Sequence, residues 1–192
     1  MAFLLDSSTK TVGDAWTRIL EFTNLVIAGY NIRANCVRVT VICYSDNAVV
    51  CLELNRYNDI NSLQQAVRQL RLLNVGSNLA NAFNLLRTRV FNFAGNVIRP
   101  GATLIAVVVT DSQIQPSQPL TSEANSVKSQ GVRVIAVGIR VDANTLNVLY
   151  AVSSNRYAVS VNDYSQLPGV VSRVVEWGCF LVPTTPPPVI GN

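Results

Sequence analysis

Apolar positions along the chain alternate between short runs typical of strands and the spacing typical of helices. The run AFLLD at residues 2–6 predicts a short strand. From Trp16 to Tyr30 the apolar residues recur at intervals of three and four, which predicts a helix packed against a core. Residues 36–54, CVRVTVICYSDNAVVCLEL, predict two strands joined by a tight turn at SDNA, the one antiparallel hairpin that we expect.

The rest of the chain continues the alternation. Strands are predicted in ATLIAVVVTD (102–111), VRVIAVGI (132–139) and RYAVSV (156–161). Helices are predicted at about 60–72, 77–91, 120–130, 142–151 and 163–177. Near-continuous β-branched runs are typical of parallel strands buried on both faces. The pattern therefore predicts an α/β fold, a doubly wound and mostly parallel six-stranded sheet with one antiparallel edge strand and helices on both faces.

Length and composition fit one globular domain. The chain has 192 residues, 49% of them hydrophobic and 14% charged. We expect residues 1–179 to form the domain and residues 180–192, which end in VPTTPPPVIGN, to be a proline-rich linker or tail. No stretch reaches the roughly 18 apolar residues that cross a bilayer, so membrane insertion is not expected. The opening MAFLL is too short, and meets Asp6 too soon, to be a signal peptide.

Charge and residue types narrow the function classes. The net charge of +4 comes from scattered residues, so no nucleic acid partner is expected. The sequence contains no histidine, which excludes Ser-His-Asp and Cys-His catalysis as well as His-ligated zinc. It also lacks the G-x-G-x-x-G and P-loop nucleotide motifs. We therefore predict a protein that is not an enzyme. An enzyme using Ser8 and Asp111 on a small substrate is the alternative, and it would lack a suitable base.

Hydroxyl and carboxyl side chains follow two of the predicted parallel strands. They occur in DSSTK (6–10) and TDSQ (110–113), and a GSN turn (76–78) opens a predicted helix. In a doubly wound sheet, ligands bind outside the carboxyl ends of the strands. Hard divalent cations such as Mg²⁺ take oxygen ligands of these kinds. The sequence therefore predicts a site where the three segments meet.

Four segments carry a family resemblance. FLLDSSTKT, GSNLANAF, LIAVVVTDSQ and VRVIAVGI resemble, in order and spacing, the signatures of a von Willebrand factor type A (vWA) domain. The resemblance runs from Ala2 to about Cys179 and is to matrix members of the family, such as matrilins, A-domain collagens and mussel byssal matrix proteins. It implies a vWA/Rossmann-like fold in a secreted adhesion or scaffold module of the extracellular matrix. Such a module would bind collagen or another matrix protein and have neighbouring domains in a longer chain.

The resemblance also implies a metal-ion-dependent adhesion site. Ser77 stands where the family has threonine, and Ser112 stands where a glycine usually follows the second aspartate. The implied metal ligands are Asp6, Ser8, Ser77 and Asp111. The implied ligand-binding residues around them are Lys10, Asn78, Ser112 and Ile114.

Lys10 departs from the family pattern because it stands where a second serine ligand belongs. An ammonium about 4 Å from a divalent cation is repelled by roughly 2 to 8 kcal/mol, depending on the effective dielectric. Either Lys10 turns to solvent and a weakened site for Mg²⁺ or another divalent cation remains, or its ammonium lies between Asp6 and Asp111 as a substitute cation. Metal binding is expected to be weak or absent in both cases. A structural repeat with an inactive adhesion site is the alternative function.

The four cysteines leave the disulfide pattern open. Cys43 and Cys51 lie nearly opposite each other in the predicted hairpin, although a one-residue slip would put them on opposite faces. Cys36 is expected to begin its strand and Cys179 to end the last helix, both at the far end of the sheet from the site. The pairs 43–51 and 36–179 are therefore conceivable, and buried free thiols are the alternative.

Overall fold

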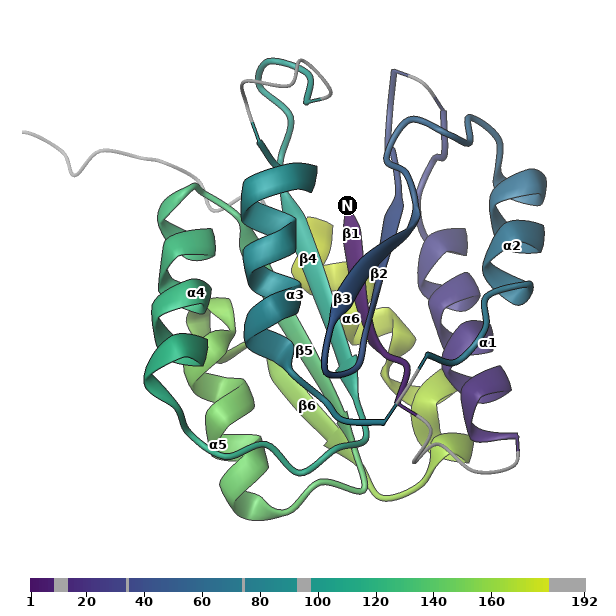
Figure 1. Cartoon of the computed structure of the whole chain (residues 1–192). Helices are drawn as coiled ribbons and strands as arrows, with labels where there is room; N and C mark the ends of the chain where they lie inside the picture. Colours follow the sequence, from purple (N-terminus) through teal and green to yellow (C-terminus); the bar gives the residue numbers. More distant parts are fainter. Residues whose placement is uncertain (9–13, 34, 74, 93–97, 180–192) are drawn as a thin grey trace, which may run out of the picture.

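The central sheet has six strands, and its order and directions confirm the predicted fold class. The computed structural model describes residues 1–8, 14–33, 35–73, 75–92 and 98–179. Its strands are β1 (Ala2–Asp6), β2 (Thr40–Tyr44), β3 (Ala48–Leu52), β4 (Ile105–Thr110), β5 (Arg133–Ile139) and β6 (Ala158–Val161). They lie in the order β3-β2-β1-β4-β5-β6, and the pairing is parallel except between β2 and β3. The carboxyl ends of the parallel strands meet at the lower edge of the sheet in Figure 1.

Helices cover both faces of the sheet (Figure 1). The α-helices are α1 (Ala15–Ala28), α2 (Ile60–Arg68), α3 (Leu79–Leu85), α4 (Gln118–Ser129), α5 (Ala143–Val152) and α6 (Val171–Cys179). Shorter segments are the π-helical η1 (Leu86–Val90) and the 3₁₀-helical η3 (Ser154–Arg156) and η4 (Tyr164–Val170). Among the described residues, no helix is long and apolar enough to cross a membrane.

The burial of β1 on both faces explains its unbroken apolar run. Phe3 and Leu5 pack in one core with residues of α1, α2 and α6. Ala2 and Leu4 pack in the other core with residues of α3, α4 and α5. A strand buried on both faces has no solvent side that would select polar residues. The run therefore ends at Asp6, where the chain leaves the sheet.

Three helix predictions differ most from the structure, and the other three differ from it by one or two residues at their ends. The helix predicted at 60–72 ends at Arg68. The helix predicted at 77–91 begins at Leu79, because the Asn78 side chain accepts a hydrogen bond from the Asn81 backbone N–H and caps it. The segment predicted at 163–177 starts as the 3₁₀ turn η4, which contains Pro168, and becomes α-helical at Val171.

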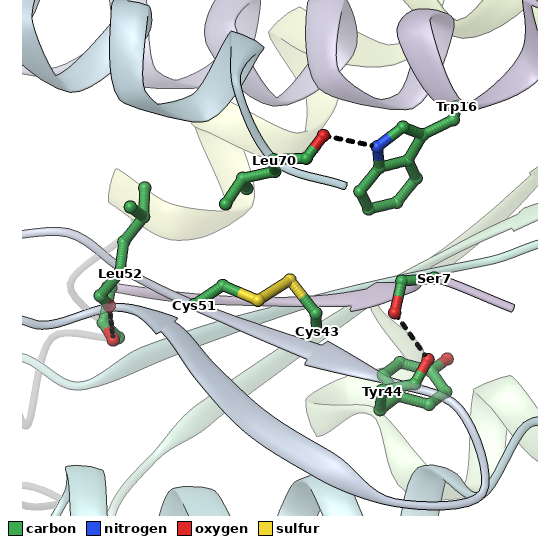
Figure 2. Close-up of a disulfide and its surroundings, with 8 residues drawn as sticks. Ser7, Trp16, Cys43, Tyr44, Cys51, Leu52 and Leu70 are labelled. Carbon is green, nitrogen blue, oxygen red and sulfur yellow. Dashed lines mark hydrogen bonds between the residues drawn. A yellow bond between two sulfur atoms is a disulfide. The ribbon is translucent and has the colours of Figure 1, made fainter. Parts of the chain in front are cut away.

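The predicted 43–51 disulfide is present and joins β2 to β3 (Figure 2). Cys43 pairs with Val49, so Cys51 lies two positions farther along β3 and shares its face with Val49. The pairing of the two strands shifts by one residue between Val41 and Ile42, so that Ile42 pairs with Val50 and Val41 with Leu52. The Cα atoms of the two cysteines are 6.0 Å apart, within the ordinary range for a disulfide.

The 36–179 disulfide is not formed, and that prediction is wrong for this structure. Cys36 and Cys179 are both exposed free cysteines. Cys36 lies in the loop before β2 and does not begin a strand, because β2 starts only at Thr40. The topological part of the prediction was correct, since both residues line one cavity of about 350 Å³ together with Met1, at the amino end of β1.

Candidate functional site

Asp6 is the centre of the candidate site. It is the last residue of β1, and its side chain is fully buried. Its Oδ2 accepts hydrogen bonds from Ser77 Oγ at 2.7 Å and from Thr110 Oγ1 at 2.9 Å. Its Oδ1 accepts a hydrogen bond from the Ser8 backbone N–H at 3.3 Å. A buried carboxylate needs such donors, so β1, β4 and the turn before α3 are joined through one side chain.

The turn before α3 delivers the Ser77 hydroxyl to Asp6. Gly76 has φ +90°, a backbone conformation that favours glycine, and a Cβ there would lie 1.7 Å from Asp46 Oδ1. The Asn78 backbone N–H donates to the Ser45 carbonyl at 2.6 Å. The turn is thereby fixed against the β2–β3 turn, and α3 starts one residue after Asn78. A glycine and a capping residue on either side of Ser77 therefore set its position.

Asp111 follows β4 and interacts with η4. Its Oδ2 accepts a hydrogen bond from the Tyr164 hydroxyl at 2.6 Å. Burial is the main cause that raises the pKa of Tyr164, and this hydrogen bond to the Asp111 carboxylate raises it further. The phenol is therefore protonated at neutral pH and acts as the donor.

A fully buried tyrosine lies beside the same carboxylates. Tyr44 is the residue of β2 that pairs with Asp6. Burial raises the pKa of Tyr44 well above its usual value, and the negative charge of Asp6 raises it further. Next to it, the backbone N–H and the hydroxyl of Ser7 both donate to the Tyr44 carbonyl, at 2.9 and 3.1 Å, and Figure 2 shows the hydroxyl bond. These contacts hold the chain as it leaves β1.

The structure brings the expected metal-ligand residues to one edge of the sheet. Asp6 and Ser77 are in direct contact. Ser8 lies two residues after the end of β1, and Asp111 directly follows the end of β4. Ser8 is fully buried. Thr110, the last residue of β4, donates to Asp6 and is followed directly by Asp111, so the two aspartates come from the adjacent ends of β1 and β4. Lys10 lies outside the described residues.

The other expected ligand-binding residues differ in accessibility. Asn78 is exposed at the start of α3, where its side chain caps the helix. Ser112 is buried, and its backbone N–H donates to Thr110 Oγ1 at 3.2 Å. Ile114 is 8% exposed and packs in the core beneath α3 to α5. Of these three residues, only Asn78 presents its side chain to solvent.

Sequence reasoning assigned no role to three residues of the site, Tyr44, Thr110 and Tyr164, although Thr110 lies in the TDSQ segment that it singled out. Thr110 carried a usable signal, because a hydroxyl residue in the last position of β4 must lie beside the last position of β1. The two tyrosines carried none. Tyr44 reads as an apolar strand residue, and Tyr164 reaches Asp111 from 53 positions away.

The donor set fits a hard divalent cation in kind. Asp6 and Asp111 supply carboxylate oxygens, and Ser8 and Ser77 supply hydroxyl oxygens. A hydroxyl that donates its hydrogen to Asp6, as Ser77 does, keeps its lone pairs for a cation. Within the ranges that the structure describes, no group of three or more His, Cys, Asp or Glu side chains could hold a metal by itself. Metal binding here would therefore depend on hydroxyl ligands.

Comparison with known proteins gives the family. The sequence profile of the von Willebrand factor type A domain matches residues 1–173. Mouse matrilin-3 is 24% identical over 184 residues, which cover 94% of this chain and 38% of matrilin-3. The mouse collagen alpha-4(VI) chain is 27% identical over 142 residues, covering 73% of this chain and 6% of the collagen chain. The chain thus spans well under half the length of these relatives.

Solved structures show the same fold. Proximal thread matrix protein 1 from the mussel byssus superposes with a TM-score of 0.84 at 20% identity, covering 93% of this chain and 46% of that one. A second structure of that protein, described as having a zinc-occupied MIDAS motif, has a TM-score of 0.83 at 17% identity, covering 93% and 45%. The similar proteins include matrix proteins, in agreement with the extracellular-matrix location expected from the sequence. This chain is a member of the von Willebrand factor type A domain family.

Proposed function

We propose that this domain is a non-enzymatic adhesion or scaffold module that binds collagen or another extracellular-matrix protein. The contact surface would be the face at the carboxyl ends of the strands, around a degenerate adhesion site. The observation that carries the proposal is the hydrogen bond of 2.7 Å between Ser77 and Asp6, which links the two segments expected to form that site. Its similarity to matrilin-3 and to a collagen VI chain supports a matrix partner.

The proposed metal ligands are Asp6, Ser8, Ser77 and Asp111, and a divalent cation bound there would offer an open position to a carboxylate of the partner. Lys10 is two residues after Ser8 in the sequence and adds a positive charge where the family pattern has a ligand serine. We propose that metal binding is weak and that the contact depends mainly on fixed protein groups. The surface would comprise Lys10, Ser77 and Asn78, with Ser112 and Ile114 supporting it from below.

The test is binding of the purified domain to immobilised collagen and to other matrix proteins, with Mg²⁺ or with EDTA. We expect binding that EDTA reduces little, and full loss with EDTA would show a working metal site. Failure to bind any matrix protein in either condition would favour the inactive structural repeat.

A charge substitution tests the location of the contact. Asn78→Asp keeps a side chain that can cap α3 but adds negative charge to the proposed face, so we expect collagen binding to weaken several-fold. Asn61→Asp is the matched control, because it makes the same change at an exposed position in the first turn of α2. β3 is antiparallel to β2, so it ends at the edge of the sheet where the parallel strands begin, and α2 follows it in the chain. The start of α2 is therefore away from the proposed face. Equal effects of both variants would contradict the proposed face.

Lys10→Ser tests the role of the lysine. It restores a hydroxyl and removes a positive charge, so titration calorimetry should show tighter Mg²⁺ or Mn²⁺ binding than in the parent. If the variant binds metal no better than the parent, our interpretation of Lys10 is wrong.

A further inference from the structure

Tyr164 forms a hydrogen bond with Asp111 that no feature of the sequence predicted. Its hydroxyl donates to Asp111 Oδ2 at 2.6 Å, a length typical of a strong hydrogen bond to a carboxylate. The tyrosine is the first residue of η4 and comes from the loop after β6, whereas Asp111 follows β4. An oxygen of a candidate metal ligand is thus already bound by a group of the protein itself.

A surrounding network holds Tyr164 in this place. The guanidinium of Arg140 lies over its ring, 5.7 Å from the centroid. Arg140 also faces the Asp163 carboxylate at 3.9 Å, and Asp163 caps η4 by accepting from the Ser165 backbone N–H at 2.9 Å. The Arg140 guanidinium therefore contacts both the ring of Tyr164 and the residue that caps η4, the turn that carries Tyr164.

The backbone of Arg140 is itself constrained. Arg140 has φ +57°, which is uncommon for a residue with a side chain. Its N–H donates to the Val161 carbonyl at 2.9 Å, and its carbonyl accepts from Gln113 Nε2 at 3.1 Å. Such conformations persist where surrounding contacts impose them, and they concentrate at functional sites. The contacts here come from the end of β6 and from the loop after β4, the two segments that lead to Tyr164 and Asp111.

We propose that Tyr164 is an internal competitor for cations at Asp111. To bind a divalent cation or a cationic group of a partner, that oxygen must share or lose the hydrogen bond of Tyr164. Tyr164 also lines a cavity of about 100 Å³ with Arg18, Phe22 and Leu25 of α1, which offers space beside the ring when the bond breaks. This inference rests on the adhesion site proposed above and names a residue that sets its cation affinity.

The experiment compares Lys10→Ser with the double variant Lys10→Ser/Tyr164→Phe, using Mn²⁺ alone in titration calorimetry. The Lys10→Ser background removes the lysine charge, so that the effect of Tyr164 can be measured directly. We expect the double variant to bind Mn²⁺ about tenfold more tightly, equivalent to about 1.4 kcal/mol. Adding Asp111→Ala should abolish the gain if the effect acts through that carboxylate.

Tyr150→Phe in the same background is the matched control. Tyr150 lies on α5, half-buried beneath the guanidinium of Arg156 at 4.4 Å, and α5 precedes the amino end of β6, far from Asp111. Equal Mn²⁺ affinity with and without Tyr164→Phe, weaker affinity, or no binding by either chain would overturn the proposal. This experiment uses no matrix protein. A failure to bind collagen would therefore count against the proposed function, but it would not affect the interpretation of the Mn²⁺ titration.

Discussion

Ser77 Oγ and Asp6 Oδ2 are 2.7 Å apart, although 71 positions separate the two residues in the chain. The bond joins the turn before α3 to the end of β1. Thr110 donates to the same oxygen, so one buried carboxylate organises three segments. Leaving a buried charged acceptor without a donor costs more than the net gain from making the bond. The stability of this edge therefore depends on hydroxyl groups supplied by distant segments.

Ser77→Ala should lower the free energy of unfolding by about 1 to 3 kcal/mol, because Asp6 loses a donor while remaining buried. Ser77→Thr keeps the hydroxyl and should stay close to the parent. Urea unfolding followed by tryptophan fluorescence measures both. An alanine variant as stable as the parent would show that the bond contributes nothing.

Gly76→Ala should destabilise the domain more than Gly131→Ala. Both glycines have positive φ, +90° and +80°, so each substitution adds backbone strain of about 1 to 2 kcal/mol. Only at Gly76 would the new Cβ meet another group, the Asp46 carboxylate, whereas nothing lies within 4 Å at Gly131. We expect an additional loss of about 1 kcal/mol at Gly76 by urea unfolding.

The double variant Gly76→Ala/Asp46→Ala identifies the cause of that additional loss. Removing the Asp46 side chain should recover most of it, because the two positions are in contact and their effects are then not additive. Equal losses at Gly76 and Gly131, or no recovery in the double variant, would contradict the steric explanation.

Cys43→Ala/Cys51→Ala should destabilise the oxidised domain by about 2 to 3 kcal/mol, the value expected for a disulfide that closes a loop of this length. Cys36→Ala/Cys179→Ala is the matched control, since it removes two exposed thiols that are not bonded to each other. Urea unfolding with and without a reductant distinguishes the effect of losing the disulfide from the effect of losing two free thiols. Under reducing conditions the parent should lose most of its advantage over Cys43→Ala/Cys51→Ala.

The contribution of Glu123 to stability should disappear in acid. Hydrogen bonds from Arg87, at 3.1 and 3.3 Å, and from Asn84, at 3.0 Å, lower the pKa of Glu123 below 4.5. A carboxylate whose pKa is lower in the folded state than in the unfolded state stabilises the fold at every pH above its unfolded-state pKa. This stabilisation is lost as the pH falls through its folded-state pKa.

The stability difference between the parent and Glu123→Gln should therefore be constant above about pH 5 and shrink below it, as measured by urea unfolding from pH 7 to pH 3. Glu21→Gln is the control, because Glu21 faces Arg18 at 3.5 Å in an exposed pair that contributes little. A difference for Glu123→Gln that does not change with pH would mean that the charge of Glu123 has no role.

Local pattern was sufficient to predict the elements of the fold. The apolar run of β1, the turn residues between β2 and β3 and the helical spacing of α1 each depend on neighbours within a few positions. The alternation of strands and helices then left few topologies, because parallel strands need crossover helices. The same reasoning placed Asp6, Ser8 and Asp111 at one edge of the sheet, since strand ends in a parallel sheet meet there, and the family resemblance added Ser77 from the turn before α3.

Only the tertiary structure decided which groups those side chains contact. Tyr164 reaches Asp111, and Thr110 reaches Asp6, through packing between segments whose spacing has no periodic signal. The pairing of Cys43 with Cys51 depended on strand register, which the sequence left open by one residue. A period in the sequence reports which face of an element is buried, whereas a hydrogen bond requires positions accurate to a fraction of an ångström, and these are set by the whole fold.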